Sequence, residues 1–419
     1  MIDIAHLKDN LDQYKKRLKS KGYLGNLNHI LSIYDAKNNI HVKLDGIKNT
    51  KNILSKQIGI LAQKGESIDE QKKQSDILSN EIEMLQKDFD VLKSELDEEM
   101  LSIPNLPDED VPEGSDESSN IELDKIIYNQ QESGPDHVEI GELLGLLDFE
   151  TANKLSGSRF VLLKGKLAQL QRALIKFMLD EASSNNYEEY YVPYIVNSDS
   201  LMATGQLPKF EDDQFNVGEG KYLIPTAEVP LTNIFRNESI MAKDMPIKMT
   251  AHTPCFRAEA GSYGKDTRGM IRQHQFEKIE LVKFVHANKS DKALDELVNH
   301  ASQILDKLEL SYRKVVLCTG DLGFSAAKTI DLEVWLPSQK CFREISSCSN
   351  FRDFQTRRMN TKLIDGSKKI YPHTLNGSAL AVGRTLLAIL ENYYENGVGV
   401  HIPKVLGPYL DFNLIQTKK

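Results

Sequence analysis

Apolar residues in the first hundred positions recur at alternating steps of three and four. One run extends from Ile33 to Leu61, and a second extends from Leu78 to Leu96. This spacing is the heptad seam of a coiled coil, so each run predicts a long helix. Lys64-Gly65-Glu66-Ser67 interrupts the pattern between them. The two helices and their short turn predict an antiparallel helical hairpin over about residues 30–103.

The pattern changes beyond residue 120. Helical spacing over Phe160–Ala182 predicts one helix, and short strand-like runs follow it. Several of these runs are separated by hairpin-length turns, which favours an α+β domain: a largely antiparallel sheet with helices around it. The strand-like runs are Tyr190–Ile195, Tyr222–Ile224, Lys248–His252, Phe276–Phe284, Lys314–Cys318, Asp331–Leu336 and Phe342–Ser346.

Between the hairpin and the sheet, residues 104–120 are rich in Pro, Asp and Ser. Such a composition predicts a linker. We therefore expect an N-terminal domain over residues 1–103, a linker over 104–120 and a second domain over 121–419.

Composition excludes several classes of protein. The 419 residues are 40% hydrophobic and 27% charged, which are globular values. The net charge of −9 argues against a uniformly basic nucleic-acid binder. No apolar run is long enough to predict a transmembrane helix, and the first residues lack the pattern of a secretory signal. The four cysteines include no C-x-x-C pair, which favours free thiols in a reducing cytosol.

Charge is divided unevenly along the hairpin. Residues 1–64 carry twelve Lys and Arg against five Asp and Glu, whereas residues 65–100 carry four against twelve. Complementary charges that pair the two helices explain this division. The alternative explanation is a basic helix face that meets phosphates. The sequence alone leaves both interpretations open.

Common nucleotide and hydrolase motifs are absent: there is no G-x-x-x-x-G-K-[ST], no G-x-G-x-x-G after a strand and no G-x-S-x-G. Three polar clusters stand out instead. Thr226-Ala-Glu228 follows a strand-like run, and Phe256–Glu280 reads as a strand, a glycine-rich loop and a returning strand. The third, Asn376–Glu391, is a loop that leads into an amphipathic helix.

These side chains suit a small polar substrate beside a polyphosphate. Arginines bind phosphate bidentately, and an aromatic face such as that of Phe276 can stack on a base. On the returning strand Phe276, Lys278 and Glu280 share one face. Glu228 and Glu280 can hold an ammonium or a hydroxyl group, and Glu344 with Ser347 could hold Mg²⁺. Taken alone, each of these residues is typical of a solvated ion pair or of a protein core. The interpretation therefore depends on the order and density of the three clusters.

Because these clusters occur in this order along the sequence, the chain resembles the seryl-tRNA synthetase family of the bacterial type, a family of class II aminoacyl-tRNA synthetases. Phe256-Arg257-x-Glu259 and its loop resemble class II motif 2, and Gly383-Arg384-Thr385 resembles motif 3. The Pro193 region resembles motif 1, which supports a homodimer in this class. Thr226-Ala227-Glu228 resembles the serine-binding segment, and Glu344-Ile345-Ser346-Ser347 resembles the ATP segment. The resemblance covers nearly the whole chain, including the hairpin.

The resemblance implies a role for each matching residue. Arg257 would grip the α-phosphate and the reacting carboxylate, and Arg384 would bind the γ-phosphate. Thr226 and Glu228 would fix the serine amino group, while Glu280 would receive the serine hydroxyl beside Ser378. The other ATP contacts would come from Ala258, Glu259, Gln273, Phe276, Glu344, Ile345, Ser346 and Ser347, of which Glu344 and Ser347 would also hold Mg²⁺.

The resemblance also implies the reaction and the partners. A serine–tRNA ligase would form seryl-adenylate from L-serine and ATP, then transfer the seryl group to tRNA-Ser and, as the family usually does, to tRNA-Sec. The loop Gly261–Arg272 would close over ATP and touch the acceptor end of tRNA. The hairpin would lie along the long variable arm of tRNA-Ser. The enzyme would be a cytoplasmic homodimer. Ala258 and Tyr263 depart from the residues common in the family, and no zinc ligand set is present.

Three alternatives remain beside this interpretation. Relatives that load amino acids onto carrier proteins would keep the fold but lack the hairpin. A catalytically dead paralogue would have lost residues among Arg257, Glu259, Glu280, Glu344 and Arg384, yet all five are in place. A coiled-coil oligomerisation protein would explain the hairpin but leave the three polar clusters unexplained.

Overall fold

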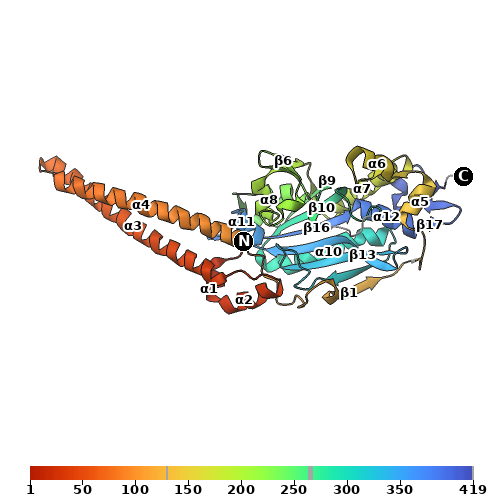
Figure 1. Cartoon of the computed structure of the whole chain (residues 1–419), viewed down its shortest axis with the longest axis horizontal. Coiled ribbons are helices and arrows are strands. Elements are labelled where there is room, and N and C mark those ends of the chain that lie inside the picture. The colour runs from red at the N-terminus through yellow and green to blue at the C-terminus, as the bar shows by residue number, and fades with distance from the viewer. Residues whose placement is uncertain (129–130, 263–267, 418–419) are drawn as a thin grey trace. The chain divides into compact units, whose positions relative to one another are not determined.

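The computed structural model describes residues 1–128, 131–262 and 268–417. This part of the chain divides into two compact units (Figure 1). One comprises Ile2–Lys19 and Tyr23–Pro104, and the other comprises Met1, Ser20–Gly22 and Asn105–Lys419. No helix in the described residues is long and apolar enough to cross a membrane.

The helical unit is built around a two-helix hairpin, as the heptad spacing predicts. α1 (Ile4–Asp9) and α2 (Leu11–Ser20) precede α3 (Leu27–Lys64), which packs against α4 (Asp69–Ser102). Leu44, Leu54 and Leu96 from the predicted seam are buried. Since the hairpin has little core beyond this seam, apolar contacts between the two helices stabilise it.

The second unit contains an eight-stranded sheet in the order β1-β11-β12-β13-β16-β10-β9-β4. All neighbours are antiparallel except β4 and β9, which confirms the predicted α+β class. In chain order its strands are β1 (Ile121–Ile126), β4 (Glu188–Glu189), β9 (Ile247–Phe256), β10 (Gln275–Val285), β11 (Tyr312–Val316), β12 (Lys328–Leu336), β13 (Cys341–Arg352) and β16 (His373–Ala381).

Helices cover one face of this sheet and form the main core with it. α7 (Lys166–Ser184), α10 (Ser290–Lys307) and α12 (Val382–Asn392) supply most of the buried helical side chains. On β10 the odd-numbered residues Ile279, Leu281 and Val285 belong to this core. The even-numbered residues before Val282 face the other way, which leaves that part of the strand available for a site.

Shorter elements complete the second unit. The remaining helices are α5 (His137–Leu144), α6 (Phe149–Ser156), α8 (Ser198–Thr204), α9 (Glu228–Asn233) and α11 (Phe354–Arg358). Small sheets join β2 (Leu147–Asp148) with β3 (Leu162–Leu163); β5 (Ile195–Asn197) and β6 (Asn216–Gly218) with β7 (Lys221–Leu223); β8 (Ser239–Met241) and β15 (Lys368–Ile370) with β14 (Lys362–Asp365); and β17 (Tyr394–Glu395) and β19 (Leu414–Gln416) with β18 (Gly399–His401).

Two predicted elements differ from the structure. The helix predicted over Phe160–Ala182 begins only at Lys166, because Leu162–Leu163 pair with β2 and Gly165 has a positive φ of 57° that ends the extended segment. The strand predicted over Tyr190–Ile195 is wrong: residues 190–194 are irregular between β4 and β5. Pro193 lies within them and has no N–H to give to a sheet.

The segment predicted as a linker, residues 104–120, makes specific contacts within the second unit. The Asn105 side-chain amide donates hydrogen bonds to the carbonyls of Ser325 (2.9 Å) and Phe351 (2.8 Å). Asp108 accepts several hydrogen bonds from Arg352, the shortest of them 2.6 Å long. Val111 is buried in a small apolar cluster that also contains Phe351.

The turn of the hairpin gives a test of its local stability. Gly65 follows α3 with φ of +74°, and its N–H donates to the Ala62 carbonyl. An added Cβ at Gly65 or at Gly59 would meet no atom within 4 Å. Gly65→Ala should therefore lower the local unfolding free energy by about 1 kcal/mol through backbone strain alone. Gly59→Ala, inside the same helix, should raise it by about 0.5–1 kcal/mol.

Native-state hydrogen exchange of amides in the last turns of α3 measures both effects. Protection should fall about fivefold in Gly65→Ala and rise in Gly59→Ala. Equal changes in the two variants would contradict the assignment of Gly65 as a left-handed helix cap.

Candidate active site

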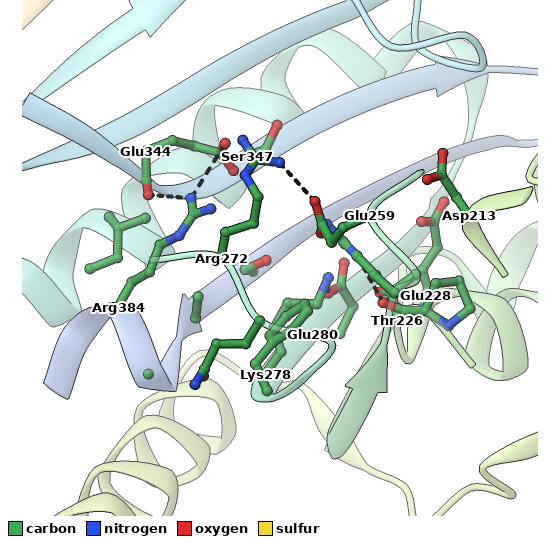
Figure 2. Close-up of a pocket in the computed structure, with 18 of the residues that line it drawn as sticks. Asp213, Thr226, Glu228, Glu259, Arg272, Lys278, Glu280, Glu344, Ser347 and Arg384 are labelled. Carbon is green, nitrogen blue, oxygen red and sulfur yellow. Dashed lines mark hydrogen bonds and ion pairs between the residues drawn. The ribbon is translucent and has the colours of Figure 1, made fainter. Parts of the chain in front are cut away.

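A cavity of about 570 Å³ opens on the free face of the sheet. Its walls come from β10, β13 and β16, from the start of α12, and from the segments around Thr226, Arg257 and Arg272 (Figure 2). Twelve of the sequence-predicted site residues line it: Thr226, Glu228, Arg257, Glu259, Gln273, Phe276, Glu280, Glu344, Ile345, Ser347, Ser378 and Arg384.

Three other predicted residues do not line the cavity. Ala227 is buried in an apolar cluster with Leu231 and Met249. The Ser346 hydroxyl donates to the carbonyl of Ser378 at 2.6 Å, so it ties β13 to β16. Ala258 contributes a backbone contact near the cavity: its N–H donates to the Asp213 carbonyl at 2.9 Å. Part of the predicted loop Gly261–Arg272, including Tyr263, lies outside the described residues.

One polar face of β10 forms the floor of the cavity. Phe276, Lys278 and Glu280 alternate along the strand and all line the cavity, as their spacing predicts. The Lys278 ammonium lies 2.6 Å from Glu280 Oε2. The Asn376 side-chain amide, from the neighbouring β16, donates to Glu280 Oε1 at 2.9 Å. Glu280 is therefore a buried carboxylate with a fixed orientation.

A second buried carboxylate, Glu228, lines the same cavity at the start of α9. The Gln355 side chain donates to its Oε1 at 2.7 Å, and its backbone N–H donates to the Thr226 hydroxyl at 3.2 Å. Burial, reinforced by the negative charge of Glu280, raises the pKa of Glu228 to about 7. A cation bound between these two carboxylates would favour the charged form of Glu228 and lower its pKa.

The arginines lie on the wall beside Phe276 and at the α12 end of the cavity. The Arg257 guanidinium carbon lies 5.2 Å from the centre of the Phe276 ring, and its Nε donates to the Pro225 carbonyl. Arg384, in the first turn of α12, donates to the Glu344 carbonyl at 2.6 Å and lies 3.5 Å from the Glu344 carboxylate. Such arginines suit a polyphosphate.

Arg272 and Glu259 join the two sides of the loop stem. Their ion pair measures 2.8 Å (Figure 2). Glu259 has a positive φ of 54°, which is uncommon for a residue other than glycine and typical of functional sites. The Ala260 N–H donates to the Asp213 carboxylate at 2.9 Å, so Asp213 fixes the outgoing side of the same stem.

A β-bulge arranges the oxygen ligands at the rim. Glu333 of β12 pairs with Glu344, but Leu332 pairs with Ser346, so Ile345 is the extra residue on β13. The bulge turns Glu344 and Ser347, three residues apart, toward the same cavity. Asp331, opposite Ser347, has one buried carboxylate oxygen without a hydrogen-bond partner. Burial, followed by the charge of Glu344, raises the pKa of Asp331 well above its usual range.

These oxygens fit a hard divalent cation such as Mg²⁺, which prefers carboxylate, hydroxyl and phosphate oxygens. Glu344 and Ser347 alone are too few to hold the ion without oxygens from a ligand. Among the residues that the structure describes, no group of three or more His, Cys, Asp and Glu could hold a metal. The arrangement thus suits a cation that arrives with a phosphate.

Several residues that shape the site have no role assigned from the sequence, although the spacing places Lys278 on the shared face of its strand. Lys278, Asn376 and Asp213 line the cavity, and Gln355 orients Glu228. The period of two along β10 gave a signal for Lys278. The contacts of Asn376 and Gln355 join segments about a hundred residues apart, and no local spacing marks such pairs.

Known proteins resemble this chain along its whole length. Residues 1–107 match the family model for the seryl-tRNA synthetase N-terminal domain, and residues 209–393 match that for the tRNA synthetase class II core domain (G, H, P, S and T). The serine–tRNA ligase of Psychrobacter sp. (strain PRwf-1) is 49% identical over 424 residues, which cover 98% of each chain.

Solved structures agree with these matches. The crystal structure of seryl-tRNA synthetase from Pyrococcus horikoshii complexed with ATP superposes with a TM-score of 0.92, at 33% identity and 100% coverage of both chains. The cytoplasmic serine-tRNA ligase from Naegleria fowleri in complex with AMP gives a TM-score of 0.87, at 29% identity, and covers 100% of this chain and 99% of that one.

The raised pKa of Glu228 makes a prediction about stability. Because this pKa is higher in the folded chain than the ordinary value of 4.5, protonation favours folding. The contribution is fully present below about pH 4.5 and is lost as the pH rises through about 7. Relative to Glu228→Gln, the wild type should lose about 3 kcal/mol of unfolding free energy across this window.

Urea unfolding followed by the fluorescence of Trp335, the single tryptophan, reports on the sheet. Glu142→Gln, on the exposed side of α5, is the matched control and should keep the wild-type pH dependence. Parallel pH profiles for wild type and Glu228→Gln would contradict the raised pKa.

Proposed function

Since the chain belongs to the seryl-tRNA synthetase family of class II ligases, we propose that its cavity joins L-serine to ATP and then passes the seryl group to tRNA. The observation that carries this proposal is the pair of buried carboxylates, Glu228 and Glu280, in one cavity with Arg257 and Arg384. The carboxylates suit the ammonium and hydroxyl of serine, and the arginines suit a triphosphate.

In the first step, an oxygen of the serine carboxylate attacks the α-phosphorus of ATP. The bond from that phosphorus to the bridging oxygen breaks, so seryl-adenylate and pyrophosphate form. Arg257 holds the two reacting groups together, while Phe276 stacks on the adenine and Arg384 binds the γ-phosphate. Orientation and charge neutralisation account for the catalysis, and no protein nucleophile is required.

Glu344 and Ser347 would hold Mg²⁺ together with phosphate oxygens of ATP. The ion, when bound, neutralises negative charge on the phosphates. The fit rests on the bulge at Ile345, which turns both side chains toward the cavity, and on the partnerless oxygen of Asp331 beside them. Arg384, beside Glu344, reaches the same region of the cavity from α12.

In the second step, the terminal ribose hydroxyl of tRNA attacks the seryl carbonyl carbon. The ester bond to the ribose forms, AMP leaves, and the hydroxyl proton passes to the departing phosphate. We extend the proposal to tRNA-Ser and tRNA-Sec, to a cytoplasmic enzyme and to a homodimer. Support for a homodimer comes from Tyr191 and Ile195, which flank Pro193 and are exposed in a single chain.

The selection of serine rests on the buried partners of its hydroxyl. Glu280 is oriented by Lys278 and Asn376, and Ser378 lies directly across from it on β16. A site built to bind a hydroxyl rejects an analogue that lacks it, because the buried polar groups are then left unpaired. Alanine, which lacks the hydroxyl, should therefore be rejected strongly.

ATP–pyrophosphate exchange with each of the twenty amino acids, without tRNA, tests the first step. The wild type should exchange with serine alone. Glu280→Gln keeps the side-chain volume and should lower kcat/KM for serine about 100-fold, with KM for ATP within about twofold. Glu277→Gln, on the same strand but outside the cavity lining, is the control. No exchange with any amino acid would refute the activity, and full activity of Glu280→Gln would refute its role.

The basic helix of the hairpin gives a separate test of tRNA binding. Replacing the exposed Lys43, Lys48 and Lys56 of α3 by Gln should raise KM for tRNA about tenfold and leave serine-dependent exchange unchanged. The dependence of affinity on salt should weaken by about one unit of slope for each phosphate that the helix no longer neutralises.

Replacing Lys72, Lys73 and Lys87 of α4 by Gln is the matched control. If α3 meets phosphates, this second triple variant should charge tRNA normally. Equal effects of the two triple variants would instead favour complementary pairing of the helices as the reason for the charge division.

A further inference from the structure

A buried histidine–glutamate pair lies outside the cavity lining. His137 begins α5, and Glu391 lies in the last turn of α12; the two helices are in contact (Figure 1). His137 Nδ1 lies 2.8 Å from Glu391 Oε1, and the side chains are only 4% and 0% exposed. None of the residues assigned above to serine, ATP or Mg²⁺ belongs to this pair.

The hydrogen bonds of the pair fix its protonation. The Met270 N–H points at His137 Nε2 from 3.0 Å, so Nε2 must accept and carries no proton. The imidazole proton is then on Nδ1 and is donated to Glu391 Oε1. The other oxygen of Glu391 accepts from the hydroxyl of Ser338 at 2.7 Å and from its N–H at 3.3 Å. His137 is therefore an oriented, neutral acceptor.

The acceptor holds residues 268–272, which precede β10 and form the returning stem of the glycine-rich loop. Met270 and Ile271 line the cavity directly. The stem fits closely against the imidazole, because a Cβ on Gly269, whose φ is +80°, would lie 2.2 Å from His137 Nε2. Arg268, one residue earlier, pairs with Asp136 at 3.3 Å. The stem is thus docked on the first turn of α5.

The same stem is bound from the other end of α12. The Ile271 carbonyl accepts a hydrogen bond from Arg384 Nε at 3.2 Å. Arg384 and Glu391 lie seven residues apart, about two turns, on α12. The helix that carries Arg384 therefore also carries the carboxylate that orients His137. Arg272, the next residue of the stem, pairs with Glu259 across the loop.

We propose that His137, oriented by Glu391, is a positioning residue for ATP. It anchors the loop stem at Met270. The anchored stem then holds Arg384 through the Ile271 carbonyl and Glu259 through Arg272. The inference rests on the proposed function, because it assigns these groups to the ATP half of the cavity. Serine binding depends on Glu228, Glu280 and Ser378, which are on other elements and do not contact the stem in the hydrogen bonds described.

Three substitutions separate the acceptor from the volume of the side chain. His137→Ala removes both, His137→Phe keeps an aromatic ring without an acceptor, and His137→Gln keeps an acceptor. His300→Ala is the matched control. His300 is a partly buried histidine of α10 whose Nδ1 lies 3.1 Å from the Tyr187 hydroxyl oxygen. All four full-length variants are compared with the wild type for thermal stability.

Two readouts are needed. In serine-dependent ATP–pyrophosphate exchange, His137→Ala and His137→Phe should each lower kcat/KM for ATP by about 10- to 100-fold, with KM for serine within about twofold. His137→Gln should recover to within about threefold of the wild type. Amide hydrogen exchange at Met270, measured without substrates, should accelerate at least tenfold in the Ala and Phe variants and not in His300→Ala.

The outcomes distinguish this inference from the proposed function. An inactive wild type would refute the function, while the Met270 amide would still test the anchor. Unchanged ATP kinetics and unchanged Met270 exchange in His137→Ala would overturn the inference. So would parallel losses for serine and ATP that match a loss of thermal stability in every variant, because that result would make His137 a general structural residue.

Discussion

The structure of the site depends on the two-residue period of β10. The odd-numbered residues Ile279, Leu281 and Val285 are buried under helices, whereas Phe276, Lys278 and Glu280 form the cavity floor. Neighbours on both sides, β9 and β16, fix the register of the strand. A slip by one residue would place the charged side chains in the apolar core and remove the floor, so packing behind the sheet determines the chemistry in front of it.

A shortage of positive charge around Glu228 accompanies that floor. Lys278 lies against Glu280, but Glu228 has a neutral partner, Gln355, and its pKa rises to about 7. A ligand with an ammonium group would supply the missing charge. At the other end Arg384 and the oxygens of Glu344 and Ser347 are arranged for a phosphate and its cation. In the proposed function, this division of charge would hold the amino acid and the nucleotide in one orientation, with their reacting groups between them.

Periodic features of the sequence predicted much of this. The seam residues Leu44, Leu54 and Leu96 are buried as their heptad positions require, and the alternation on β10 predicted one shared face. Irregular features were not predictable from spacing. Ile345 forms a bulge only because β12 lies beside it, and Gly165 and Pro193 end elements that hydrophobic pattern alone would continue. Long-range polar pairs, such as Gln355 with Glu228 and His137 with Glu391, leave no periodic trace at all.

The central claim is that Glu228 and Glu280 receive the ammonium and hydroxyl of serine. Proton release on binding tests it most directly. Titration calorimetry of a non-hydrolysable seryl-adenylate analogue at pH 6.5, in buffers of different ionisation enthalpy, counts the protons exchanged. Because the pKa of Glu228 is about 7 without ligand, binding of the ammonium should release roughly half a proton or more from the wild type and almost none from Glu228→Gln. Tight binding without proton release, or equal release by the variant, would contradict the account.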